Sequence, residues 1–92
     1  MAFLKEQRVV VTSEVLSRNL DGEAVLLDLA SGTYFGLADA GATLWALFEK
    51  GTTVGEASAR LVAEYDVDAA TAERDLDALL ADLARRGLVE IS

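Results

Sequence analysis

The spacing of hydrophobic positions changes near the middle of this chain. In EAVLLDL, residues 23–29, alternate residues fall on opposite faces of an extended strand, so that Val25, Leu27 and Leu29 share one face. From residue 40 onward, apolar side chains recur at intervals of three and four residues, which is the period of a helix. The pattern therefore predicts strands in the first part of the chain and helices in the second.

Two turn signals divide the strand region into three segments. Asp21-Gly22 and Ser31-Gly32 each place a glycine, which accepts a positive φ, between two apolar stretches. Short turns of this kind join antiparallel neighbours, so we predict a three-stranded meander. Its strands cover residues 14–20, 23–29 and 33–37, and the last of them, TYFGL, is short and uncharged.

Three helices are predicted after the meander from their end signals. Asp39 is placed as the N-cap of the first helix, Thr53 to Glu56 form a capping box for the second, and Asp68 caps a third over residues 69–86. Gly51 and Gly87 are placed to end the first and third helices. The residues expected in the core are Gly41, Trp45, Phe48, Val54, Ala57, Leu61, Tyr65, Ala72, Leu76, Leu79, Leu80 and Leu83.

These elements predict one α+β domain over residues 1–92, with a three-stranded antiparallel sheet followed by three helices. That order is similar to a winged helix-turn-helix domain. Residues 1–12 fit the pattern poorly, and Val9 to Val11 are either a strand or a loosely docked, flexible N-terminal arm. An arm lying beside residues 33–37 would have to move before another strand could pair there.

Composition narrows the functions open to a chain of 92 residues. There is no histidine and no cysteine, which excludes Ser-His and Cys-His catalysis and disulfides. No phosphate loop, calcium loop or metal-ligand cluster is present, so neither enzymatic activity nor a cofactor is expected. The net charge of −8 disfavours nucleic acid as a partner. We see no secretory signal or membrane span, and therefore expect a cytoplasmic protein.

Three binding classes remain open on the residues alone. A winged-helix DNA-binding regulator would read DNA with residues 68–87, although that helix is acidic. An acyl carrier would need an Asp-Ser pair, which this chain lacks. A peptide-binding module would add an extended peptide to the uncharged strand at residues 33–37. In the plainest alternative, Tyr34, Phe35 and Leu37 only pack the core.

The stretches LLDLASGTYFGL, GATLWALFEKG, YDVDAATAERDLDALLADL and GLVE, in this order, resemble the PqqD family. The resemblance covers residues 14–91. It implies a non-catalytic adaptor that binds the leader of a ribosomally made precursor peptide and presents it to a modifying enzyme, either a radical enzyme or a leader peptidase. In that family the leader adds beside the third strand of the sheet and lies against the third helix. The peptide-binding residues that the resemblance implies are Thr33, Tyr34, Phe35, Gly36, Leu37, Asp75, Leu79, Asp82, Leu83 and Arg86.

The resemblance also implies different roles for these residues. Tyr34, Leu79 and Leu83 are expected to line a pocket for apolar leader side chains, and Asp75, Asp82 and Arg86 to orient polar groups. An open strand edge also permits pairing between copies, so both a monomer and an edge-strand dimer are consistent with the sequence.

Overall fold

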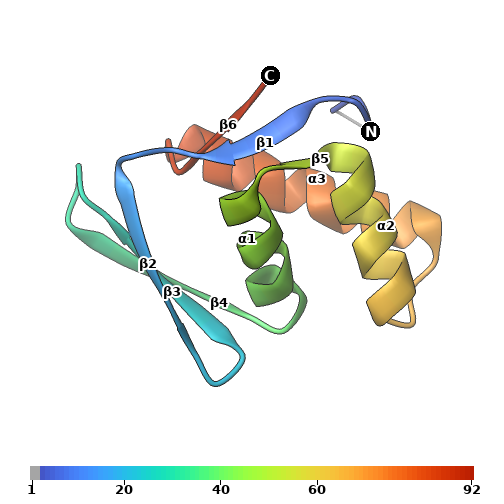
Figure 1. The fold of residues 1–92 in the computed structure, drawn as a ribbon, viewed down its shortest axis with the longest axis horizontal. Helices are drawn as coiled ribbons and strands as arrows, with labels where there is room; N and C mark the ends of the chain where they lie inside the picture. Colours follow the sequence, from blue (N-terminus) through green and yellow to red (C-terminus); the bar gives the residue numbers. More distant parts are fainter. Residues whose placement is uncertain (1–2) are drawn as a thin grey trace.

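Two small sheets and three helices make up residues 3–92, which are the residues that this computed structural model describes (Figure 1). The larger sheet is the predicted meander, with its strands in the order β2-β3-β4 and every pair antiparallel. Its strands are β2 (Val15–Leu20), β3 (Glu23–Asp28) and β4 (Thr33–Ala38). The meander extends away from the helices at one end, where β2 and β3 meet in a hairpin (Figure 1).

The hairpin between β2 and β3 has the predicted two-residue turn. Asp21 and Gly22 have φ values of 48° and 81°, and two successive positive φ values define the turn whose twist matches that of paired strands. Gly32, in the second turn, has a φ of 71°. Asp28 supports that second turn, because its carboxylate accepts hydrogen bonds from the Ala30 amide at 3.1 Å and the Ser31 hydroxyl at 2.8 Å.

Most of the predicted helix ends are confirmed. Thr53 and Glu56 form the reciprocal capping box, and the Asp68 carboxylate accepts a hydrogen bond from the Thr71 amide at 2.7 Å. Gly51 and Gly87 follow the first and third helices with φ values of 83° and 76°. The helices are α1 (Ala40–Lys50), α2 (Val54–Glu64) and α3 (Ala69–Arg85).

Asp39 differs from the prediction. It occupies the N-cap position of α1, but its side chain makes no capping hydrogen bond, and its φ is 53°. The sharp passage from β4 into α1 requires this left-handed backbone at Asp39. The residue therefore redirects the chain instead of satisfying the first amides of the helix.

Val9 to Val11 form a strand, which is one of the two alternatives that the sequence left open. β1 (Arg8–Val11) pairs antiparallel with both β5 (Thr52–Thr53) and β6 (Val89–Ile91), which forms a second sheet in the order β5-β1-β6. Val9 is fully buried, so residues 8–11 are docked in this second sheet and do not lie beside β4. The predicted order of three strands followed by three helices is therefore incomplete, because β1 precedes the meander, β5 lies between α1 and α2, and β6 follows α3.

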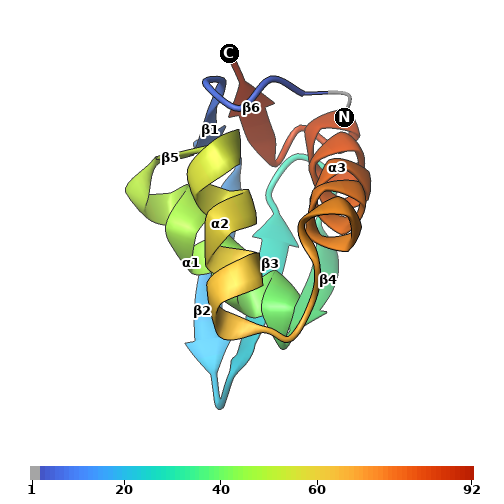
Figure 2. The ribbon, with the colours of Figure 1, turned by 90° about the vertical axis from the view of Figure 1, so that its right-hand side faces the viewer.

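The core lies between the meander and the three helices (Figure 2). Trp45 and Phe48 of α1 are fully buried and meet edge to face, with ring centroids 6.4 Å apart. From β3 only alternate residues enter the core, because successive side chains point to opposite faces of a strand. Of the expected core residues, Gly41, Tyr65 and Leu79 are half-buried and the others are buried.

Candidate functional site

β4 is an edge strand. It pairs with β3 on one side, and within residues 3–92 no strand pairs with its other side. Figure 2 shows α3 near β4, whereas β2 lies on the opposite side of the meander. An unpaired edge exposes backbone donors and acceptors that an extended chain can use.

The register of the sheet determines which residues of β4 face the open side. An antiparallel strand directs the backbone groups of alternate residues to each neighbour. The Leu29 amide donates a hydrogen bond to the Glu14 carbonyl, on the β2 side, at 2.8 Å. The backbone N–H and C=O groups of odd-numbered residues in β3 therefore point to β2, and those of even-numbered residues point to β4. Thr33, Phe35 and Leu37 pair with those even-numbered residues, so their backbone N–H and C=O groups point to β3. The N–H and C=O groups at the open edge belong to Tyr34, Gly36 and Ala38.

The side chains of β4 alternate between two faces, and this corrects one expectation. Phe35 lies opposite the buried Leu26 and is half-buried on the helix side of the sheet. Tyr34 lies opposite Leu27, and its side chain remains 68% exposed on the outer face. Tyr34 thus does not share a pocket with Leu79 and Leu83. The aromatic residue of β4 that faces α3 is Phe35.

One flank of α3 lies on the side of β4. The Arg86 guanidinium lies over the Phe35 ring, 4.5 Å from its centroid. At about 100° per residue, Asp75, Leu79 and Asp82 share this flank with Arg86. The structure thus brings Arg86, at the end of the predicted flank of α3, beside Phe35 of the predicted strand.

Asp82 connects two arginines at the end of α3. Its carboxylate accepts a hydrogen bond from Arg85 with Oδ1 and one from Arg86 with Oδ2, the second at 3.1 Å. The hydrogen bonds from Arg85 and Arg86 lower the pKa of Asp82 below its ordinary value. Arg85 is not among the residues that the sequence analysis assigns to the site. Its spacing of three residues from Asp82 is the signal that could have identified it, because residues i and i+3 are neighbours on a helix surface.

The apolar residues expected at the site differ in how accessible they are. Leu83 is only 3% exposed and belongs to the core, while Leu79 is half-buried and keeps part of its surface. Leu37 is half-buried and lies against Gly41, at the start of α1. Thr33 and Gly36 are exposed, as is the Asp75 side chain.

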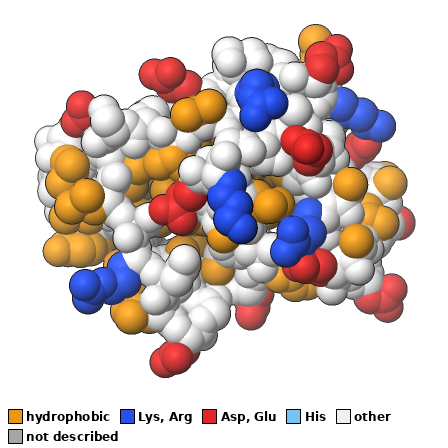
Figure 3. All heavy atoms as spheres, in the orientation of Figure 1, with side chains coloured by type: hydrophobic (Ala, Val, Ile, Leu, Met, Phe, Trp, Pro, Cys, Tyr) orange, Lys and Arg blue, Asp and Glu red, His pale blue; other side chains and the backbone are white. Residues whose placement is uncertain are grey.

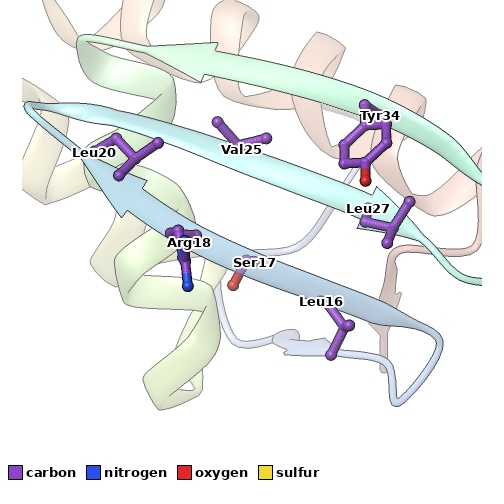
Figure 4. Close-up of a pocket in the computed structure, with 7 residues that line it drawn as sticks. All are labelled: Leu16, Ser17, Arg18, Leu20, Val25, Leu27 and Tyr34. Atoms are coloured by element: carbon purple, nitrogen blue, oxygen red, sulfur yellow. The ribbon is translucent and has the colours of Figure 1, made fainter.

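A second surface lies on the outer face of the meander. Figure 3 shows hydrophobic side chains on the side of the molecule where the meander lies, with charged groups scattered around them. The outer face forms a shallow hollow of about 460 Å³ in which Tyr34 lies beside Leu27, with the helices behind the sheet (Figure 4). The residues around the hollow are Leu16, Ser17, Arg18, Leu20, Val25, Leu27 and Tyr34.

Among residues 3–92, no group of three or more His, Cys, Asp or Glu side chains is placed to hold a metal ion. None of the helices described there is long and apolar enough to cross a bilayer.

The fold and its open edge define a class of small α+β domain that presents an unpaired strand beside a helix. The PqqD family, described as coenzyme PQQ synthesis protein D, matches residues 23–89. The chain belongs to this family, as the sequence resemblance predicted. No curated protein matches the chain.

Two solved structures are similar to the chain over most of its length. TbiB1, in complex with the TbiA(beta) leader peptide, is 43% identical, with a TM-score of 0.84 over 88% of this chain and 94% of that one. A lasso peptide synthetase B1, complexed with the leader peptide, is 30% identical, with a TM-score of 0.79 over 89% of this chain and 96% of that one.

Proposed function

We propose that this protein is a peptide-binding adaptor that captures the leader of a ribosomally made precursor by strand addition to β4. The observation that supports it most directly is the open edge at Tyr34, Gly36 and Ala38 in a chain 43% identical to a leader-bound protein. An added strand gains backbone hydrogen bonds that depend little on peptide sequence. Sequence preference then comes from side chains beside the edge.

The side chains of the added strand alternate between the faces of the sheet. Those on the helix side meet Phe35, Leu79 and the Asp82–Arg86 pair, and Thr33 and Leu37 flank them on β4. Leu83, which is buried, supports this surface from beneath. Asp75 lies further along the same flank of α3 and is exposed to polar groups of the peptide. Tyr34 contributes mainly its backbone, because its side chain is on the outer face.

The partner that receives the peptide is a modifying enzyme. The similarity to a lasso peptide synthetase B1 favours a leader peptidase over a radical enzyme. An adaptor that holds the leader and contacts the enzyme raises the effective concentration of the core peptide there. The chain itself contains no histidine or cysteine, and we assign it no catalytic role.

Two further points belong to this proposal. We take residues 1–92 as one domain of the winged helix-turn-helix type that works as a monomer, with the β4 edge reserved for the peptide. The two leader-bound relatives favour this use of the fold over regulation of DNA, for which the comparisons offer no support.

The test is a fluorescence polarisation titration with two labelled peptides. One is the TbiA(beta) leader, and the other is the leader encoded by the precursor gene beside the gene of this protein. Saturable binding of either peptide, about micromolar or tighter, that a scrambled peptide does not reproduce is the expected result. Failure of both leaders to bind the folded protein would overturn the proposed function.

A further inference from the structure

The Arg86 side chain is held on two sides and open on a third. Its guanidinium lies over the Phe35 ring at 4.5 Å, and its Nε donates to Asp82 at 3.1 Å. Among the residues described, no acceptor takes a hydrogen bond from its two terminal amino groups, and the side chain is 39% exposed. The arginine is therefore positioned before any ligand arrives and keeps unused donors.

The charges around Arg86 do not balance. Arg85 and Arg86 contribute two positive charges and Asp82 one negative charge, which leaves one positive charge in the cluster. The rest of the molecule is strongly acidic, with a net charge of −8. The cluster is also next to the C-terminus of α3, where backbone carbonyls favour cations. One more carboxylate would neutralise the cluster and occupy the unused donors.

We propose that Arg86 forms a carboxylate-binding site that selects an acidic residue in the leader, an inference that rests on the proposed function. Directly paired residues on adjacent strands point to the same face of a sheet. The leader residue paired with Phe35 therefore points to the helix side, where Arg86 lies over the Phe35 ring. Its two sequence neighbours point to the outer face, away from Arg86.

A carboxylate fits this position better than other side chains. A guanidinium presents its terminal donors as a planar fork that matches the two oxygens of a carboxylate. An apolar leader residue would cover those donors without accepting hydrogen bonds, which is unfavourable. A lysine or arginine would add a second positive charge to a cluster that already has one in excess.

The experiment is a glutamate scan of whichever leader binds in the titration above. Each position is replaced in turn by Glu and by its uncharged analogue Gln, and affinities are measured by polarisation. At one position we expect Glu to bind about three- to tenfold more tightly than Gln, the range between exposed ion pairs and charge-assisted hydrogen bonds. The positions on either side should show no such preference.

Two variants assign the preference to Arg86. Arg86→Gln should remove the preference for Glu, whereas Arg85→Gln should retain it. Arg85 also donates a hydrogen bond to the Asp82 carboxylate, but it is Arg86 that lies over the Phe35 ring. Both variants remove one positive charge, so a general charge effect would move both alike. Circular dichroism checks that each variant is folded.

The outcomes separate this site from the proposed function. Equal binding of Glu and Gln at every position, or a preference that persists in Arg86→Gln, would overturn the carboxylate site while leader binding itself stands. Absence of binding by every leader would instead overturn the strand-addition function.

Discussion

Gly36 lies opposite Val25 in the register of β3 and β4, and this pairing directs the Gly36 amide to the open edge. A proline at residue 36 removes the amide hydrogen without breaking a hydrogen bond to β3. Edge strands tolerate proline at such positions, where the N–H group faces away from the sheet. We expect Gly36→Pro to remain folded and to bind the leader at least about fivefold more weakly, the worth of one backbone hydrogen bond. Fluorescence polarisation measures the affinity.

Gly36→Ala is the matched control for this substitution. A Cβ at Gly36 meets no atom within 4 Å, and alanine keeps the backbone amide. Leader affinity should therefore stay close to that of the unsubstituted protein. A folded Gly36→Pro variant that binds as tightly as Gly36→Ala would contradict strand addition at this edge.

The outer face of the meander supplies a second test of where the leader binds. Leu16 and Leu27 surround the hollow, away from the helix side of β4. Replacing each with serine should leave leader affinity within about twofold, because β4 lies between these two residues and a strand added at the open edge. A loss of affinity in either folded variant would place the leader on the outer face instead.

A hydrogen bond between hydroxyl groups joins α1 to the end of α2. The Thr43 and Tyr65 oxygens are 2.8 Å apart, and both residues are half-buried. Tyr65→Phe and Thr43→Val should each lower the free energy of unfolding by about 0.5–1.5 kcal/mol. The double variant should cost less than the sum, because both changes remove one bond. Urea unfolding checks this, and strict additivity would exclude coupling between the two hydroxyls.

Much of the fold was predictable because its signals are local. The Asp21-Gly22 turn, the capping box at Thr53 and the Asp68 cap each depend on a few consecutive residues whose chemistry determines the backbone. Helical spacing likewise identified the buried side of α3, because every turn repeats the same information.

The second sheet was not predictable from such signals. Its strands contain two to four residues each, too few to show alternation, and they pair across most of the chain, as Val9 does with Thr52 and Ile91. Long-range pairing of this kind leaves no periodic trace in the sequence.

The site was predicted at the level of elements more accurately than at the level of side chains. TYFGL places Tyr34 and Phe35 side by side, and two adjacent aromatic residues do not reveal which one faces the helices. That choice depends on register with β3, where Leu26 is buried and Leu27 is not. Ala38 was missed as an edge residue for the same reason, since only the register shows its outward backbone groups.

Two helical glycines should respond differently to alanine. At Gly41 a Cβ would meet Leu37 at 3.5 Å, an ordinary contact, so Gly41→Ala should raise stability by up to about 1 kcal/mol through helix propensity. At Gly55 a Cβ would lie 3.2 Å from the Lys5 carbonyl oxygen, which accepts the Gly55 amide hydrogen bond. Gly55→Ala should therefore gain less or lose stability. Thermal unfolding of both variants measures the change in stability. An equal gain in stability at both positions would contradict this reasoning.

Acid should weaken the fold through the carboxylates at the helix starts. Hydrogen bonding, chiefly from the Thr71 backbone, lowers the pKa of Asp68 below its ordinary 3.8, and the Thr53 backbone lowers that of Glu56 below 4.5. A carboxyl whose pKa is lower in the folded state stabilises the fold fully above its unfolded pKa. That stabilisation is lost as the pH falls through the folded pKa.

Asp68→Asn and Glu56→Gln test this loss separately. Asparagine still offers an oxygen to the Thr71 amide but does not titrate, so Asp68→Asn should flatten the fall in stability below about pH 4. Glu56→Gln should do the same from slightly higher pH, and the two effects should add because the residues cap different helices. Urea unfolding at a series of pH values between about 6 and 2 measures both slopes. Slopes that match the unsubstituted protein in both variants would mean that other groups govern acid unfolding.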